Sequence, residues 1–138
     1  MFRVSFFVIF FIFISCNSNP TGNNNQAFLL TDKTWELVSL NYFGVSKLVV
    51  EKSEFTIFFS DSGTMKSKMD RNNCSGEYSV KVNNVISINT GACTKVLCGP
   101  NSKDFEVNRA LNNATTYFID DKKLRIFYGI YYLFFKSK

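Results

Sequence analysis

Cysteine has the widest chemical repertoire of the residue types in this chain, because the 138 residues include four cysteines and no histidine. A thiol can be acylated, pair in a disulfide, ligate a metal or, as a thiolate, attack a substrate. Without histidine the chain lacks Ser–His and Cys–His nucleophilic pairs, histidine-based zinc sites and the commonest general base. The roles of the cysteines therefore decide most of the chemistry that the sequence can carry.

Cys16 follows a short apolar segment. Residues 6–14 are all apolar and Arg3 precedes them, as in a secretory signal peptide, whereas a membrane-spanning helix needs about 20 apolar residues. Phe13-Ile14-Ser15-Cys16 resembles a lipobox, in which the cysteine thiol receives a diacylglyceryl group before cleavage, although Phe13 departs from the usual leucine. We expect residues 1–15 to be a lipoprotein signal peptide and Cys16 to be the lipid attachment site. The alternative is an ordinary buried cysteine.

Cleavage before Cys16 leaves Cys74, Cys93 and Cys98 in an oxidising compartment, where one disulfide and one unpaired thiol are expected. Cys74 precedes the first strand of an expected hairpin and Cys93 follows its second strand. The open end of this hairpin therefore brings the two cysteines together. Closing this loop of about 19 residues stabilises the domain by roughly 3 kcal/mol, and Cys98 is left unpaired. Cys74–Cys98 is the competing pairing. No metal site is expected, because Cys93-x4-Cys98 needs two more ligands and only Cys74 is available.

The carboxylates do not form a convincing catalytic group. Asp61, Asp70 and the pair Asp120-Asp121 lie at expected turns, and a solvated hairpin tip explains the pair better than a catalytic dyad. No glycine-rich phosphate loop is present. We therefore expect no catalytic residue, no cofactor and no enzymatic activity. The formal net charge is +5, to which Arg3 contributes one, and the lysines are scattered, so no nucleic-acid partner is expected.

A change in composition near residue 27 separates a tether from a folded domain. Asn17 to Gln26 is polar and uncharged and contains Pro20 and Gly22, which is typical of a flexible linker. Residues 16–27 are therefore expected to be the lipidated N-terminus and tether, and residues 28–138 the domain.

Alternation of apolar and polar residues dominates the domain and predicts short strands. In residues 64–69, Met65 and Met69 share one face and Lys66 and Lys68 the other. The same pattern in residues 76–82 predicts three buried side chains, Tyr78, Val80 and Val82. The expected strands cover residues 35–42, 47–52, 54–59, 64–69, 76–82, 85–89, 116–119, 124–128 and 131–135. Such a series favours an antiparallel barrel or sandwich.

One segment has a helical period instead. Between Gly99-Pro100 and Thr115, four apolar residues form a stripe with the spacing i, i+3, i+4 and i+7: Val107, Ala110, Leu111 and Ala114. Asn101 or Ser102 can cap this helix, and acidic residues lie in its first turn. The expected architecture is mainly β, with one helix before the closing strands.

Six short motifs occur in order along the chain: Trp35-Glu-Leu-Val, Phe58 through Gly63, Asn72-x3-Gly76-x-Tyr78, Ala92-Cys-Thr-Lys-Val-Leu-Cys98, Leu111-x2-Ala114-x2-Tyr117-x-Ile119 and Leu124-x-Ile126. This ordered set resembles the META domain, the family of the heat-inducible bacterial protein HslJ, over about residues 30–136. The resemblance implies a lipocalin-like antiparallel β-barrel with a helix packed on it. It implies no activity, because the family has no agreed biochemical function and its members are linked to heat shock and envelope stress.

The sequence departs from the family pattern at one cysteine. Relatives often carry Cys-Asn ahead of the Gly-x-Tyr strand, where this chain has Arg71-Asn72, while Cys98 matches their later cysteine. This departure leaves Cys98 without the partner that its relatives use, and it leaves Cys74 with Cys93. It also keeps the alternative Cys74–Cys98 pairing open.

These observations predict a non-enzymatic lipoprotein of the bacterial cell envelope that supports envelope integrity or stress tolerance by binding an envelope component. Asn17, rather than aspartate, follows the lipidated cysteine and favours the outer membrane over the inner one. The expected partners are the membrane, through the anchor, and an envelope protein, and the domain is expected to be monomeric.

Two alternatives involve the same barrel. One is a periplasmic or surface inhibitor of a hydrolase, for which an acidic target fits the basic and aromatic surface candidates Lys66, Lys68, Phe127 and Tyr131. The other is a carrier of a small apolar ligand, for which the aromatic candidates are Phe55, Phe59, Tyr78, Tyr128 and Phe135. Such residues are more often plain core, because side chains usually fill a barrel of this size.

Overall fold

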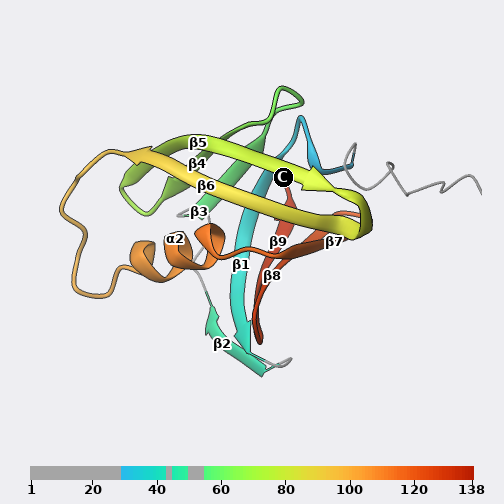
Figure 1. Cartoon of the computed structure of the whole chain (residues 1–138). Coiled ribbons are helices and arrows are strands. Elements are labelled where there is room, and N and C mark those ends of the chain that lie inside the picture. Colours follow the sequence, from blue (N-terminus) through green and yellow to red (C-terminus); the bar gives the residue numbers. More distant parts are fainter. Residues whose placement is uncertain (1–28, 43–44, 50–54) are drawn as a thin grey trace, which may run out of the picture.

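The fold is given by a computed structural model, which describes residues 29–42, 45–49 and 55–138 (Figure 1). The expected signal peptide (1–15), the tether (16–27) and Cys16 lie outside the described residues. In the part of the chain that is described, no helix has the length and apolar character needed to cross a membrane.

Antiparallel strands make up most of the domain, as expected. They are β1 (Thr34–Tyr42), β2 (Val45–Val49), β3 (Phe55–Phe59), β4 (Thr64–Met69), β5 (Asn72–Lys81), β6 (Val85–Cys93), β7 (Thr116–Asp120), β8 (Lys123–Tyr128) and β9 (Tyr131–Ser137). The sheet order is β2-β1-β3-β4-β5-β6-β7-β8-β9, and β1 also pairs with β9. This last pairing closes β1 and β3–β9 into an eight-stranded barrel, with β2 attached outside it to β1 (Figure 1). The predicted antiparallel barrel is confirmed.

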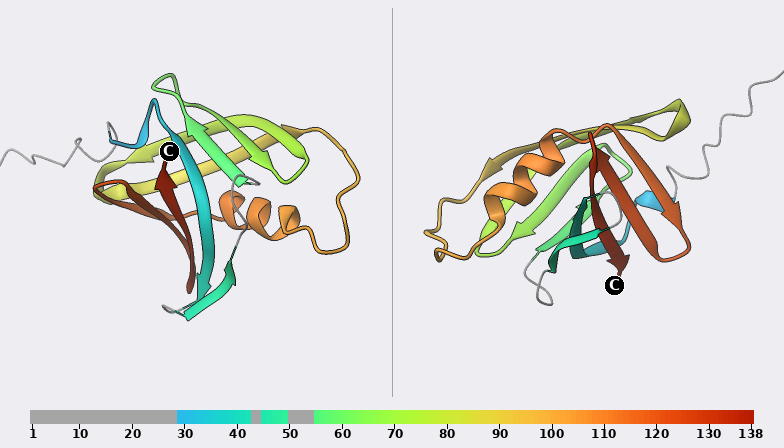
Figure 2. Two further views of the ribbon diagram at one scale, coloured as in Figure 1. Left: turned by 180° about the vertical axis from the view of Figure 1, so that it is seen from behind. Right: turned by 90° about the horizontal axis from the view of Figure 1, so that it is seen from below.

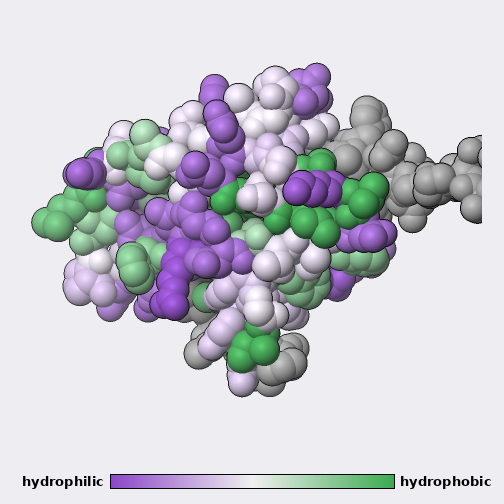
Figure 3. All heavy atoms as spheres, in the orientation of Figure 1, coloured by the Kyte–Doolittle hydropathy of each residue, from purple (hydrophilic) through white to green (hydrophobic). Residues whose placement is uncertain are grey.

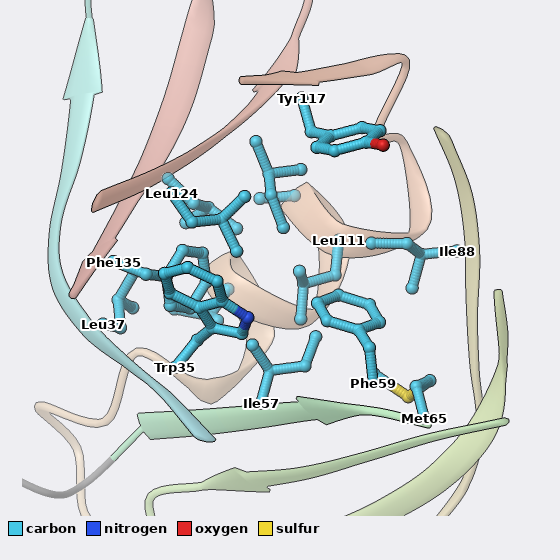
Figure 4. Packing of buried hydrophobic residues seen from close by; sticks show 14 of the residues in the cluster. Trp35, Leu37, Ile57, Phe59, Met65, Ile88, Leu111, Tyr117, Leu124 and Phe135 are labelled. Atoms are coloured by element: carbon cyan, nitrogen blue, oxygen red, sulfur yellow. The ribbon is translucent and has the colours of Figure 1, made fainter. Parts of the chain in front are cut away.

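The barrel interior is filled by side chains that alternate along the strands. Trp35, Phe59 and Phe135 come from three different strands and are at most 1% exposed, and they pack together inside the barrel (Figure 4). The Trp35 indole Nε1–H donates to the Leu30 carbonyl at 2.9 Å, so the one polar atom of this large side chain is satisfied. The Ser67 hydroxyl, in contrast, is buried without a hydrogen-bond partner among the described residues.

The predicted alternation in β4 is confirmed, but one core residue predicted for the next strand is wrong. Met65 and Met69 are buried while Lys66 and Lys68 are exposed. Val82 is 68% exposed, because β5 ends at Lys81 and Val82 belongs to the turn into β6. The following two asparagines hold that turn with φ of 61° and 56°, a conformation that asparagine tolerates well. Tyr78 and Val80 are partly buried against the core.

β5 and β6 are longer than the alternation predicts, since they cover Asn72–Lys81 and Val85–Cys93 rather than residues 76–82 and 85–89. Their pairing includes an irregularity between Ser75 and Glu77, at which Gly76 and Gly91 approach each other closely. A Cβ on Gly76 would lie 1.9 Å from the Asn89 carbonyl oxygen, so only glycine fits. This irregularity interrupts the pattern that sequence reasoning follows.

Helix α2 (Asp104–Asn112) covers the side of the barrel where β6 and β7 separate. These two strands pair in register only at Val85 and Thr116, and α2 runs alongside β6 beyond that point (Figure 2). Three residues of the predicted stripe are buried in the core, namely Val107, Ala110 and Leu111, while Ala114 lies after the end of the helix and is partly buried. The residue before the helix is Lys103, which makes no capping hydrogen bond, although the Ser102 hydroxyl accepts a 3.4 Å hydrogen bond from the Asp104 N–H. The helix therefore completes the wall that the strands leave open.

Candidate functional site

A disulfide joins β5 to β6 at the end of the hairpin. Cys74 and Cys93 are direct cross-strand partners with a Cα–Cα distance of 4.0 Å, and their sulfurs are bonded. This pairing is the one that the hairpin predicts, so the expected disulfide is confirmed and the Cys74–Cys98 alternative is not formed. The bond ties down the point where the chain leaves β6 for the loop toward α2.

Asn72 holds that loop from the inside. Its side chain is 8% exposed, its Oδ1 accepts from the Val96 N–H at 2.8 Å, and its Nδ2 donates to the Val96 carbonyl at 3.2 Å. The amide thus pairs with Val96 as a neighbouring strand would. Oδ1 also accepts from the Thr94 hydroxyl at 3.2 Å, and Nδ2 lies within 3.3 Å of both Cys98 Sγ and Asp104 Oδ2. One buried asparagine therefore connects β5, the loop and the start of α2.

Cys98 is the free thiol of the described residues, and it belongs to this cluster around Asn72. Its Sγ–H donates to Asp104 Oδ2 at 3.4 Å. Desolvation raises the pKa of the Cys98 thiol, and the Asp104 carboxylate raises this pKa further, while hydrogen bonds from Ser102 and the Arg71 backbone oppose the shift. The thiol is therefore protonated at neutral pH and is a poor nucleophile.

The Asp104 carboxylate is held in its charged form. Desolvation raises its pKa, but hydrogen bonds from Cys98, the Phe105 N–H, Ser102 and Asn72 outweigh desolvation and leave the pKa of Asp104 below its usual value. A carboxylate with a lowered pKa is a weak general base, and its thiol neighbour stays protonated. Cys98 and Asp104 thus behave as hydrogen-bonding groups that fix the loop.

The outer end of the same loop is apolar. Val96 is 48% and Leu97 90% exposed, and Figure 3 shows hydrophobic atoms at this end of the molecule, while hydrophilic side chains cover the surface over α2. The loop therefore presents apolar side chains to solvent and polar ones to Asn72.

Asparagines of α2 replace the strand pairing that β6 lacks. The Thr90 N–H donates to Asn112 Oδ1 at 3.1 Å, and the Thr90 hydroxyl bonds to Asn108 Oδ1 at 2.6 Å and accepts from Asn112 Nδ2 at 2.7 Å. Thr90 itself is only 3% exposed. These bonds fix α2 against β6 through groups that would otherwise be buried unsatisfied.

An open groove of about 610 Å³ crosses the outer face of the sheet beside the disulfide. The pairing registers place Thr34, Phe58, Lys66, Ser75 and Ala92 in one row that runs across five strands. A second row contains Thr56, Lys68 and Asn73, and Thr94 hydrogen-bonds to the Asn73 backbone. The groove lies between these rows.

The other sequence candidates do not gather at one site. Phe127 and Tyr131 lie on β8 and β9, where they pack on Tyr132 and Tyr128, and β8 is four strands from β4 in either direction around the barrel. The structure therefore separates them from Lys66 and Lys68, and no basic and aromatic inhibitor surface forms from these four residues. Asp120 and Asp121 are both exposed: Asp120 ends β7 opposite Lys123, and Asp121, with φ of 53°, begins the turn to β8.

The aromatic residues considered for a ligand carrier belong to the core. Phe55, Phe59 and Phe135 are buried, while Tyr78 and Tyr128 pack against them from the edge of the cluster. Among the described residues, no group of three or more cysteine or acidic side chains could hold a metal ion.

Sequence reasoning missed Asn72 as the centre of the loop and missed the groove. A polar residue two positions before Cys74, on the same face of a strand, is the signal that points to Asn72. The groove residues are ordinary outward positions on five strands, and only the register brings them together.

Comparisons with solved structures show the same fold. A crystal structure of a DUF4847 family protein from Bacteroides vulgatus has a TM-score of 0.61 and 20% identity, covering 79% of this chain and 94% of that one. An NMR structure of a protein from Burkholderia xenovorans has a TM-score of 0.65 and 18% identity, covering 80% and 85%. A third structure, also solved by NMR, has a TM-score of 0.57 at 17% identity, covering 79% and 92%.

In sequence, none of the curated proteins matches this chain. The model of the META domain family matches residues 29–137, which is most of the chain and all of the barrel described above. The Arg71 backbone hydrogen-bonds to the Cys98 thiol, so position 71 lies beside Cys98 in the fold. The chain belongs to the META domain family.

Proposed function

We propose that this chain is a non-enzymatic lipoprotein of the bacterial cell envelope, and that it supports envelope integrity or stress tolerance by binding an envelope component in the groove across β1 and β3–β6. The observation that carries the proposal is the groove itself. It is an open groove of about 610 Å³ on the outer face of a barrel whose interior is filled by its own side chains.

The location follows from the N-terminal sequence. A signal peptide over residues 1–15, a lipid on Cys16 and Asn17 after it place the protein on the outer membrane more readily than on the inner one. Residues 16–27 are the expected lipidated N-terminus and tether, and a flexible chain of this length has a root-mean-square span of about 20 Å. The monomeric domain is therefore held near the bilayer, within reach of other envelope molecules.

The chemistry of the described residues supports binding rather than catalysis. The chain has no histidine, the Cys98 thiol is kept protonated, and Asp104 is engaged in hydrogen bonds. No run of basic residues suits a nucleic-acid partner. If the purified full-length protein hydrolysed peptidoglycan or peptides, the non-enzymatic assignment would fail.

A photo-crosslinking amino acid at Ser75 of the full-length lipoprotein tests the binding proposal in living cells. Ser75 is exposed in the groove, and Ser79 is its matched control, because it is an exposed serine on the same face of the same strand outside the groove. We expect a discrete adduct from Ser75 and none from Ser79, and we expect C16A to abolish the adduct by releasing the protein from the membrane. No adduct from Ser75, or equal adducts from both, would contradict the proposal.

A further inference from the structure

A ligand in the groove must be bound by side chains. Along the groove, β1, β3, β4 and β5 pair with neighbours on both sides, while β6 pairs with β5 on one side and faces α2 on the other, where Asn112 accepts from the Thr90 N–H. An extended peptide that lies across β1, β3, β4 and β5 therefore meets no free strand edge to which it could add. The outward side chains alone decide which chemistry fits.

Two lysines give the groove its charge. Lys66 and Lys68 are two residues apart on β4, which separates their Cα atoms by about 7 Å. Neither makes an ion pair with a described residue, and no carboxylate lines the groove. Glu36 lies beyond Thr56 at the end of one row, outside the groove lining, and has a partner of its own. The groove is therefore a cationic surface without internal compensation.

The remaining lining combines one aromatic ring with short hydroxyl and amide side chains. Phe58 lies in the first row between Thr34 and Lys66, and the polar groups of the lining are Thr34, Thr56, Asn73, Ser75 and Thr94. Hydroxyl and amide groups both donate and accept hydrogen bonds, as the hydroxyls of a sugar do. An aromatic face packs well against the C–H face of a sugar ring.

We propose, on the basis of the proposed function, that the groove binds an anionic glycan, that is, a chain of sugar rings that carry carboxylate or phosphate groups. The rings lie across the strands, with one of them on Phe58, and the charged groups contact Lys66 and Lys68. The short polar side chains on either side bond to the ring hydroxyls.

The test is a binding titration with the full-length lipidated protein in detergent micelles. The carboxylate probe is trigalacturonate, the phosphate probe is maltotriose with a terminal phosphate, and the neutral control is the methyl ester of trigalacturonate. We expect saturable binding of at least one anionic probe, which identifies the charged group, and at least tenfold weaker binding of the methyl ester. Absence of binding by both anionic probes, or equal binding of the ester, would overturn the proposal.

Two double variants distinguish binding of the glycan in the groove from nonspecific attraction to the positively charged protein. We expect K66Q/K68Q to lose about tenfold in affinity, because each lysine supplies a charge-assisted hydrogen bond at an exposed site. The matched control is K122Q/K123Q, which removes the same charge at the β7–β8 turn and is expected to change affinity less than twofold. Equal losses from both double variants would show nonspecific attraction and would overturn the proposal. Circular dichroism confirms that each variant is folded.

A substitution at Phe58 distinguishes binding of a glycan from binding of an acidic peptide. F58A is expected to weaken binding of the glycan probe about fivefold, and adding K66Q/K68Q to F58A is expected to weaken it further. Triglutamate is expected to bind the wild-type protein at least tenfold more weakly than trigalacturonate. Triglutamate binding as tight as the glycan, with no effect of F58A, would assign the groove to acidic peptides instead. A Ser75 adduct with a protein and no glycan binding would overturn this ligand class while leaving the proposed function in place.

Discussion

Replacing Asn72 by alanine removes the side chain that holds the loop between β6 and α2. The losses include both bonds to Val96, in which the Asn72 amide accepts from its N–H at 2.8 Å and donates to its carbonyl at 3.2 Å. The bond from the Thr94 hydroxyl at 3.2 Å is lost as well. The contact of Nδ2 with Cys98 involves sulfur and adds less, while the contact with the Asp104 carboxylate at 3.3 Å is charge-assisted.

The expected loss of stability is about 2 kcal/mol. A hydrogen bond contributes a net of about 1 kcal/mol, and Val96 is 48% exposed, so water can replace part of what its backbone loses. A domain of this size has a urea m-value of roughly 1–1.5 kcal/mol per M, which converts the loss into a midpoint shift of about 1.5 M. Because the barrel strands are not touched, the fold itself is expected to persist.

Urea unfolding of N72A and of the exposed control N73A measures this loss, and hydrogen exchange reports on the loop. We expect the Val96 amide to lose its protection in N72A while the amides of β3 and β4 keep theirs. A loss below about 0.5 kcal/mol for N72A, or an unchanged Val96 amide, would refute the role given to Asn72.

Four further predictions follow from the same structure. Replacing both Cys74 and Cys93 by alanine is expected to lower the free energy of unfolding by about 3 kcal/mol in urea unfolding, because their disulfide closes a loop with a sequence separation of 19. G76A is expected to cost at least about 2 kcal/mol in the same assay, since its Cβ meets backbone at 1.9 Å. S67A is expected to be neutral or to stabilise by up to about 1 kcal/mol, because it removes a buried hydroxyl without a described partner. Folding lowers the pKa of Asp104, so the charged carboxylate stabilises the folded protein. This stabilisation is complete above the unfolded pKa of about 3.9 and is lost as the pH falls through the folded pKa. D104N is therefore expected to make the free energy of unfolding depend less on pH in the acid range.

Each of these predictions has a contrary result. If the free energy of unfolding of the disulfide-free variant lay within about 1 kcal/mol of the wild-type value, the disulfide would not reduce the entropy of the unfolded chain as expected for a closed loop of this length. A stable G76A would mean that β5 and β6 separate easily at their irregularity. A destabilised S67A would reveal a partner for the hydroxyl, and a D104N curve parallel to that of wild type would contradict the lowered pKa.

The sequence predicts the elements of this fold well, because strand alternation and the helical stripe are local patterns. Met65 and Met69 in β4, and Val107 and Leu111 in α2, are buried as their spacing predicts. The disulfide is also predictable, since a hairpin brings Cys74 and Cys93 together without knowledge of the remaining strands.

Features that depend on several strands at once are not predictable in this way. Val82 continues the alternation of β5 but lies in a turn, because the two asparagines after it set where the hairpin reverses. The groove depends on the registers of four strand pairs, and a shift of one residue in any of them would turn Lys66 or Ser75 away from the others. Asn72 looks like a polar interruption until the loop that it holds is known.

The most direct test of the central claim is rescue of a deletion strain of the source bacterium under heat or detergent stress. Wild-type lipoprotein and the K122Q/K123Q control are expected to restore survival, and K66Q/K68Q is expected to fail although it reaches the same level in the membrane. Full rescue by K66Q/K68Q would contradict the proposal that this protein acts by binding an envelope component in the groove.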